Sequence, residues 1–275
     1  MFRFNQLLRA QEIDPGVVRL IRHRDTRNAG AVFDAAMKGD LRFDAYQEGQ
    51  VTPQVIEQIR AARYVASFVV DPLTKQTVFA GVWERLGERA APIADPFRVG
   101  DVPRESSVAF ETRRVGVYER YRGRIVIEWG DGTRAWVQRA DRQDKEILEL
   151  RKAFVPSAFP GFAEFSSSLS DVTLVPPSWS EALRTARGVY LLVHRSGAQY
   201  VGAAYGEGGF LGRWRAYASG HGGNVALREL DGSAEDYSVS ILETVGSQAT
   251  EDDVVAIEAR WKKKLGSRIH GLNRN

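Results

Sequence analysis

Residues 188–203 read GVYLLVHRSGAQYVGA, and this stretch decides the fold of the second half of the chain. Two runs rich in β-branched and aromatic residues, 188–193 and 199–203, flank the turn-forming segment His194-Arg195-Ser196-Gly197-Ala198. Such a pattern is typical of a β-hairpin. It places Tyr190 on the first strand and Tyr200 on the second. Taken singly, a strand tyrosine is usually a core or cross-strand packing residue.

Two helices and one more strand are predicted after this hairpin. A helix should run from about Gly209 to Gly220, and a strand from Tyr237 to Glu243. Thr250 followed by three acidic residues is typical of a helix N-cap, so a second helix is predicted from there to about Leu265. The order of elements is therefore ββαβα.

The last helix places a carboxylate beside apolar side chains. The apolar residues that share one helical face are Val254, Ile257, Trp261 and Leu265. Glu258 lies at the edge of that face, where an unpaired carboxylate costs roughly several kcal/mol. It should therefore be paired, protonated or bound to a cation. Two interpretations remain: a boundary glutamate that reaches solvent or pairs with an arginine, and a metal ligand.

The helix near Phe210 carries a second polar pair. Arg213 and Tyr217 are four residues apart, so they lie on the same flank of the helix. A guanidinium and a phenol in one groove suit a phosphate, and they also suit the ordinary edge of an amphipathic helix.

As a set, these residues resemble the GIY-YIG nuclease superfamily. The two tripeptides of that family are matched by Gly188-Val189-Tyr190 and Tyr200-Val201-Gly202, with valine in place of isoleucine in both. Four further positions follow in order: Arg213, Tyr217, Glu258 and Asn273. The resemblance covers about residues 188–275 and does not reach the first 155 residues.

The resemblance implies a fold and a reaction. The fold is a small α/β domain with a three-stranded antiparallel sheet and flanking helices, and the reaction is cleavage of a DNA phosphodiester with one divalent cation, Mg²⁺ or Mn²⁺. Glu258 would be the metal ligand, and Arg213 would neutralise a phosphate oxygen. The three tyrosines would form a hydrogen-bonded cup around the attacking water, and Asn273 would orient neighbouring groups or the substrate if the end of the chain folds back.

The role of Tyr190 stays open at this point. A phenol titrates near pH 10, so a general base at neutral pH needs a nearby cation. Some relatives have a lysine just after the second tripeptide, but this chain has Ala203-Ala204-Tyr205. Either Arg213 or the metal supplies the charge, or Tyr190 only relays a proton from a metal-bound water.

The region before the nuclease-like part has a different composition. We predict a β-rich, mixed domain over residues 1–155, a Ser/Pro-rich linker over 156–180, and the catalytic domain over 181–275, which together make an α+β protein. Within the first domain, a helix is expected after Thr52-Pro53, a hairpin at Gly130-Asp131-Gly132, and a closing helix over 141–154. The strand pattern loosely resembles PUA-like modules, which read a flipped or modified base.

Aromatic and basic residues make this first domain a candidate for DNA recognition. Aromatic side chains beside arginines suit either a base-stacking pocket or a small β core, and we assign Phe68, Phe79 and Trp129 to the core. Basic clusters are usually solvated faces; as candidate DNA contacts we name Arg120, Arg122, Arg124, Lys262 and Lys263, together with the loop residue His221.

Composition excludes several classes of protein. The chain has 275 residues, 43% of them hydrophobic, and a net charge of +3. It has no cysteine, which excludes disulfides, thiolate zinc sites and cysteine nucleophiles. No apolar run approaches the ~20 residues that span a bilayer. The N-terminus MFRFNQLLRAQEID has no apolar segment typical of a secretion signal, so we expect a cytoplasmic protein.

The sequence thus predicts a DNA endonuclease acting on double-stranded DNA, with target choice by the first domain. Restriction or modification-dependent defence is the favoured role, and repair is an alternative. The competing hypothesis is a non-catalytic protein that keeps a nuclease fold to bind DNA or a partner. Cutting both strands with one active site requires a homodimer or two successive nicks.

Overall fold

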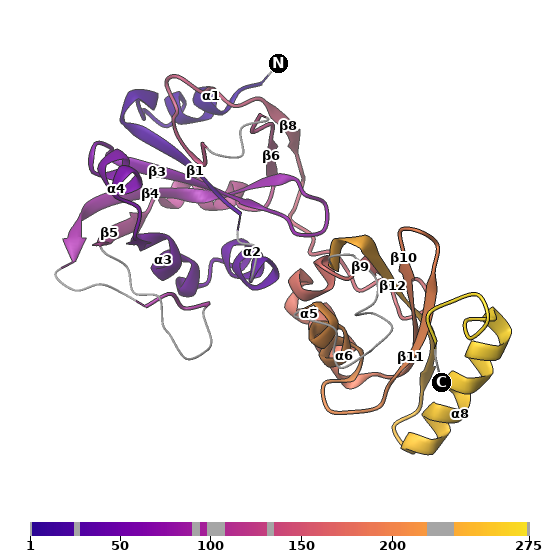
Figure 1. Cartoon of the computed structure of the whole chain (residues 1–275). Helices are drawn as coiled ribbons and strands as arrows, with labels where there is room; N and C mark the ends of the chain where they lie inside the picture. Colours follow the sequence, from indigo (N-terminus) through magenta and orange to yellow (C-terminus); the bar gives the residue numbers. More distant parts are fainter. Residues whose placement is uncertain are drawn as a thin grey trace. The chain divides into compact units, whose positions relative to one another are not determined.

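The computed structural model describes residues 2–24, 28–89, 94–97, 108–130, 135–218 and 234–273. The chain divides into two compact units, Met1–Pro156 and Ser157–Asn275. Figure 1 labels the elements of both. Each unit has its own sheet and its own buried cores.

The first unit is built on a mixed sheet, which has eight strands in the part of the chain that the structure describes. They are β1 (Val18–His23), β2 (Gly49–Gln50), β3 (Tyr64–Val70), β4 (Thr77–Arg89), β5 (Val108–Arg114), β6 (Ile125–Ile127), β7 (Val137–Arg139) and β8 (Ile147–Leu150). The strand order is β2-β5-β4-β3-β1-β7, and β6 joins β4 to β8. Only β1 and β3 pair in parallel among these described strands.

Helices cover this sheet, and its side chains alternate between two buried faces. The helices are α1 (Phe4–Arg9), α2 (Ala29–Lys38), α3 (Leu41–Glu48) and α4 (Pro53–Arg60), with short 3₁₀ turns η1 (Pro15–Val17) and η2 (Gly116–Tyr121). On β3, Phe68 packs on one face while Val65 and Val69 pack on the other. Phe68, Phe79 and Trp129 are buried in one cluster, so their assignment to the core is confirmed.

Two expectations for this unit are wrong. Residues 141–154 do not form a helix; they contain β8, which pairs with β6. The predicted hairpin between β6 and β7 is also absent from the described pairings, because β6 pairs with β4 and β8 while β7 pairs with β1. The turn residues Asp131 and Gly132 lie outside the described residues. In both cases long-range strand pairing outweighs local preference.

The second unit contains an antiparallel sheet with four strands in its described part: β9 (Ser166–Ser168), β10 (Arg187–His194), β11 (Gln199–Ala204) and β12 (Tyr237–Val245). The order is β11-β10-β12-β9, so β11 is an edge strand. The predicted ββαβα order is confirmed. The expectation of three strands is wrong, because the backbone of β9 pairs with β12.

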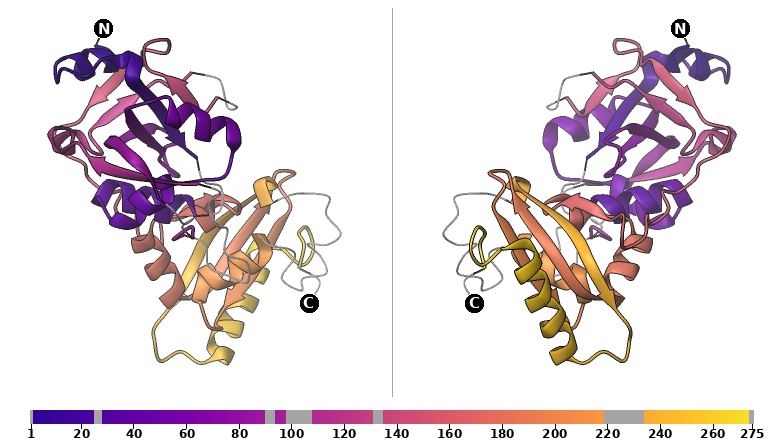
Figure 2. Two further views of the ribbon diagram at one scale, coloured as in Figure 1. Left: turned by 90° about the vertical axis from the view of Figure 1, so that its left-hand side faces the viewer. Right: turned by 90° about the vertical axis from the view of Figure 1, so that its right-hand side faces the viewer.

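Helices cover both faces of this sheet (Figures 1 and 2). Helix α8 (Glu251–Leu265) packs on one face through an apolar cluster that includes Val189, Val201 and Val254. Helices α5 (Pro177–Thr185) and α6 (Gly209–Ala218) lie on the other face, with the short turns η3 (Asp171–Leu174) and η4 (Ala234–Asp236). Tyr190 is buried on this second face, because side chains alternate along β10.

The segment 156–180 is not a linker. Phe165, Leu169, Val172 and Val175 are buried in the core under α6, and Trp179 packs against the same cluster. Its prolines and serines suggested an open connection, but β9 and the start of α5 fall within it. The second unit therefore begins before the residues that resemble the nuclease family.

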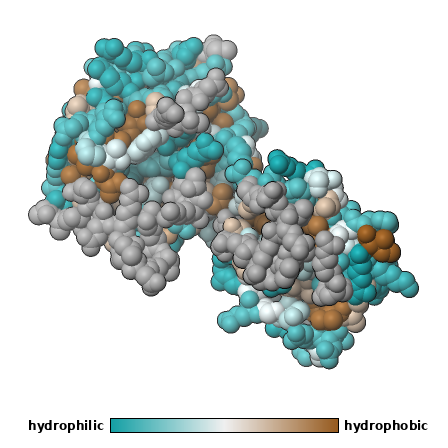
Figure 3. All heavy atoms as spheres, in the orientation of Figure 1, coloured by the Kyte–Doolittle hydropathy of each residue, from teal (hydrophilic) through white to brown (hydrophobic). Residues whose placement is uncertain are grey.

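The visible surface is mostly hydrophilic. In Figure 3, which shows one face, hydrophobic residues stand singly or in small groups among the coloured atoms. That distribution is usual for a globular surface. Across the described residues, no helix combines the length and the apolar character needed to cross a membrane.

Candidate active site at the edge of the second sheet

The strand pairing of β10 and β11 explains the glycines of the two tripeptides. Tyr190 lies directly opposite Gly202. A Cβ atom on Gly202 would stand 2.3 Å from the hydroxyl oxygen of Tyr190, so the ring of Tyr190 occupies the space above that glycine. A Cβ on Gly188 would stand 2.0 Å from the carbonyl oxygen of Glu243 on β12. Both glycines are needed for close packing.

Three tyrosines form one cluster between β10, β11 and α6. The hydroxyls of Tyr190 and Tyr217 are 2.9 Å apart. The ring of Tyr200 meets that of Tyr217 edge to face at 6.4 Å between centroids. Burial raises the pKa of Tyr190 well above its ordinary value, and burial likewise raises the pKa of Tyr200. Both phenols are therefore protonated at neutral pH.

Arg213 connects this cluster to solvent. Its guanidinium carbon lies 5.0 Å from the centre of the Tyr217 ring. The predicted neighbourhood of Arg213 and Tyr217 on α6 is therefore present. Tyr217 faces the core, while Arg213 is exposed at the surface of the same helix. The arrangement leaves a permanent positive charge beside neutral phenols.

Helix α8 presents Glu258 from the other side of β11. Its start is fixed by a capping box, in which the Thr250 hydroxyl accepts from the Asp253 N–H and the Asp253 carboxylate accepts from the Thr250 N–H. Of the three states considered for Glu258, the structure shows pairing, with a lysine and not an arginine: Lys262 Nζ lies 3.4 Å from Glu258 Oε1. The side chain of Glu258 is 15% exposed and that of Lys262 only 4%.

A cavity of about 520 Å³ lies where these elements meet at the sheet edge. Its lining comes from β11 and the following loop, from α6 and from α8: Tyr200, Ala203, Ala204, Tyr205, Gly206, Glu207, Gly209, Gly212, Arg213, Ala216, Val255 and Glu258. A phenol, a guanidinium and a carboxylate thus share one open cavity. Tyr190 and Tyr217 lie behind this lining as a bonded pair.

Of the two tasks expected for Asn273, orienting neighbouring groups or the substrate, its position in the structure fits the first. The end of the chain does fold back, and the Asn273 amide is buried. Its Oδ1 accepts from the Val201 N–H at 2.9 Å and from the Ser267 hydroxyl at 2.6 Å, and its Nδ2 donates to the Val201 carbonyl at 2.8 Å. Asn273 therefore holds the edge strand β11 in place next to Tyr200.

The residues predicted to contact DNA are only partly on the surface. Lys263 and Arg120 are exposed, but Lys262 is buried and paired with Glu258. Arg122 is paired with Glu119 and donates to the Ala80 carbonyl. Arg124 donates to the carbonyls of Arg151 and Arg120. Three of these cations are thus committed to internal contacts, and His221 lies outside the described residues.

Sequence reasoning missed Glu207, Tyr205 and the role of Lys262. The first two lie on the loop after β11, where no periodicity signals a direction. Lys262 carried a usable signal, because it lies four residues after Glu258 on one helix and such residues are neighbours. The pairing was overlooked because Lys262 belongs to a run of three lysines, which is typical of a solvated cluster.

Comparisons with known proteins give one weak likeness. No family model matches the chain, and no curated protein matches it. Among solved structures, it is similar to the catalytic domain of the intron endonuclease I-TevI in a mutant form, with 25% sequence identity, covering 33% of this chain and 94% of that domain at a TM-score of 0.28.

Proposed function

We propose that the chain is a metal-dependent DNA endonuclease whose active site is the cavity at the edge of β11. The observation that carries this proposal is the convergence of Tyr200, Arg213 and Glu258 on one cavity, backed by the Tyr190–Tyr217 pair. These residues come from three separate elements. Ordinary core packing gives no reason for an arginine, a carboxylate and a phenol to meet there.

Each protein group has a task that matches its chemistry. Arg213 offers a forked, permanent charge that can hold a non-bridging phosphate oxygen and stabilise the charge that develops on it. Tyr200 lines the cavity and can orient a water molecule toward the phosphorus. Asn273 ties β11, next to Tyr200, to the segment that follows α8.

The protonated phenols favour one of the two roles considered for Tyr190. Because burial raises its pKa, Tyr190 is a hydrogen-bond donor and not a phenolate at neutral pH. Its hydroxyl lies 2.9 Å from that of Tyr217, so the two phenols can exchange a proton. We therefore assign Tyr190 to proton relay and positioning.

Among the described residues no group of three or more acidic or histidine side chains could hold a metal ion, so the cation proposed here rests on Glu258. Glu258 contributes carboxylate oxygens beside open space, and Mg²⁺ or Mn²⁺ prefers oxygen ligands and retains several waters. When bound, such an ion supplies positive charge for the phosphate and the leaving oxygen. Glu258 would hold it. The Lys262 ammonium already shares the carboxylate, so binding of the ion should be weak and depend on substrate.

The biological role that suits a nuclease with a separate first unit is restriction or modification-dependent defence, with the first unit choosing the target. Target choice would fall to the first unit because one small catalytic unit makes few sequence-reading contacts. Double-stranded DNA is the expected substrate. Repair of unusual DNA structures is the alternative within the same chemistry. A homodimer would allow both strands to be cut together.

The test compares cleavage by the full chain and two carboxylate variants. Glu258→Gln removes the proposed ligand charge, and Asp252→Asn removes one charge from the exposed start of the same helix. Modified and unmodified plasmid DNA are incubated with Mg²⁺ or with EDTA. We expect Mg²⁺-dependent fragments, at least about 100-fold slower formation with Glu258→Gln, and little change with Asp252→Asn.

Two results would contradict the proposal. Full cleavage by Glu258→Gln would remove Glu258 from the mechanism. DNA binding without cleavage of any substrate by the parent protein would favour the non-catalytic alternative.

A further inference from the structure

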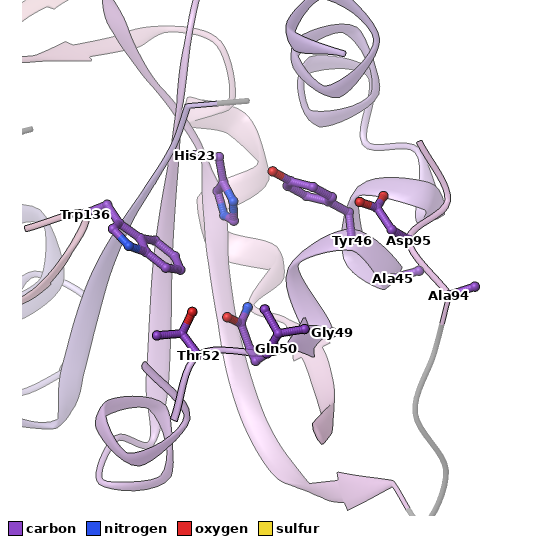
Figure 4. Close-up of a pocket in the computed structure, with 10 residues that line it drawn as sticks. His23, Ala45, Tyr46, Gly49, Gln50, Thr52, Ala94, Asp95 and Trp136 are labelled. Atoms are coloured by element: carbon purple, nitrogen blue, oxygen red, sulfur yellow. The ribbon is translucent and has the colours of Figure 1, made fainter. Parts of the chain in front are cut away.

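The first unit contains a small pocket at the end of β1, remote in sequence from the catalytic residues (Figure 4). Its volume is about 180 Å³, and its lining consists of His23, Ala45, Tyr46, Gly49, Gln50, Val51, Thr52, Ala94, Asp95 and Trp136. Four separate segments contribute to it: the end of β1, the end of α3 with β2, the segment 94–97, and the residue before β7.

His23 is the most unusual group in the pocket. Its side chain is buried against the rings of Phe43 and Tyr46, with 5.2 and 5.4 Å between ring centroids. Burial lowers its pKa to about 3, so the imidazole is neutral at physiological pH. Within the described residues, its Nε2 atom has no hydrogen-bond partner. A buried polar atom of this kind normally has a partner.

Aromatic rings flank this atom. Figure 4 shows Trp136 and Tyr46 on opposite sides of His23, whose ring nitrogens are directed toward the space between them. Gln50 and Thr52 lie below that space. The Gln50 amide is held by donation from its Nε2 to the Gln47 carbonyl at 2.7 Å. Flat apolar walls and fixed polar groups at the base suit a planar ring with a hydrogen-bonding edge.

The charge of the lining residues and the volume of the pocket limit which ligands can bind there. None of the described residues that line the pocket is a lysine or arginine, and one, Asp95, is a carboxylate. The lining therefore disfavours a phosphate and suits a neutral ring. At about 180 Å³, the pocket is below the roughly 300–1,000 Å³ of sites for drug-sized ligands. It has room for one ring system and not for a dinucleotide.

We propose that this pocket binds a single nucleobase that a DNA strand presents to it after the base has left the helical stack. The rings of Trp136 and Tyr46 flank the base, and His23 and Gln50 hydrogen-bond its edge. The proposal deepens the proposed function, on which it rests, because it assigns target choice to a defined site in the first unit. Extrusion of the base costs least where pairing is already weak.

The experiment measures binding of the full chain to labelled duplexes in EDTA, so that its outcome does not depend on cleavage. Three duplexes of equal length are compared: fully paired, with one mismatched pair, and with an abasic site in place of the mismatched base. We expect about tenfold tighter binding of the mismatched duplex than of the paired one, because less pairing energy is lost. The abasic duplex should bind less tightly than the mismatched duplex, because it has no base to insert into the pocket.

Two variants locate the preference in the pocket. His23→Phe keeps the contacts with Phe43 and Tyr46 but removes the ring nitrogens, and Trp136→Ala removes one wall. Both should abolish the preference for the mismatched duplex while affinity for the paired duplex stays within about twofold. The matched control is His194→Phe, which makes the same change at a buried histidine of the second unit. It should retain the preference.

Several outcomes would overturn this inference. One is equal affinity of the parent protein for all three duplexes. Another is a mismatch preference that survives in both pocket variants, with folding verified by thermal unfolding. A third is tight competition by free nucleosides without any preference among duplexes, which would assign the pocket to a free small molecule. Loss of cleavage in the Glu258→Gln experiment would leave this binding result unaffected.

Discussion

At the scale of single residues, a tight constraint on the second unit is the contact between Gly202 and Tyr190. The Tyr190 ring fills the position where any side chain on residue 202 would begin. Gly202→Ala should therefore displace the ring, break the 2.9 Å bond to Tyr217, and destabilise the unit by about 1–3 kcal/mol. Urea unfolding measures this change. Gly246→Ala, with open space around its Cβ, is the control and should change stability little.

A second residue-scale prediction concerns Lys262. Lys262→Met removes the cation beside Glu258 and leaves a carboxylate that is 15% exposed without its lysine partner. We expect a loss of about 1–3 kcal/mol, below the roughly 3–5 kcal/mol of a fully buried broken pair, because Glu258 still reaches the cavity. Lys263→Met, at the exposed neighbour, should cost less than about 0.5 kcal/mol. If thermal unfolding showed equal losses of stability for Lys262→Met and Lys263→Met, the inference that Lys262 is buried and paired would be wrong.

The buried His23 predicts how stability depends on pH. Its pKa is lowered to about 3 in the folded state, while an unfolded histidine titrates near 6.5. Between these values the unfolded chain binds a proton that the folded chain does not, so stability falls as pH decreases below about 6.5, by up to about 1.4 kcal/mol per pH unit. Urea titrations at about pH 4.5 and about pH 7 should show this slope, and His23→Phe should reduce it. An unchanged slope in that variant would assign the acid sensitivity to other groups.

At the scale of elements, α8 and its cap determine where Glu258 stands. Thr250→Ala removes one half of the capping box and should cost about 1 kcal/mol. Fraying of the first turn should also loosen Val255 and Glu258 at the cavity wall, so the apparent affinity for Mn²⁺ should fall together with stability. Thr185→Ala at the exposed end of α5 is the matched control, because its hydroxyl only donates to carbonyls of its own helix. A normal Mn²⁺ titration in Thr250→Ala would show that the cap does not position Glu258.

Local sequence pattern is sufficient to predict the bounds of several helices and strands. The strands β10, β11 and β12 and the helices α6 and α8 lie within a few residues of their predicted bounds, because their apolar spacing and caps are local signals. The segment 141–154 was misread for the opposite reason. Its charged and aliphatic composition suits a helix, but the backbone of β6 offers β8 a pairing partner that the local sequence does not reveal.

At the scale of the whole molecule, the division after Pro156 predicts which fragments fold. A fragment of residues 157–275 contains every described strand of the second sheet and should unfold cooperatively on its own. A fragment of residues 181–275 lacks β9 and removes Phe165, Leu169, Val172 and Val175 from the core. It should be destabilised by several kcal/mol, at roughly 1.5–3 kcal/mol for each large buried side chain, and bind a hydrophobic dye. Cooperative unfolding of the shorter fragment would show that residues 157–180 are dispensable.

The amino-acid sequence by itself determined the order of elements in the second unit, the positions of its tyrosines and glycines, and the placement of a carboxylate beside an apolar stripe on α8. These follow from side-chain periodicity and capping, which act over a few residues. Only the tertiary structure decided that Tyr190 and Tyr217 lie behind the cavity and that Lys262 pairs with Glu258. It also decided that Asn273 holds β11 and that residues 156–180 belong to a core. It alone assembled the pocket around His23. Each of these depends on segments that are distant in sequence or on the burial of one side chain among its neighbours, and local periodicity carries no information about either.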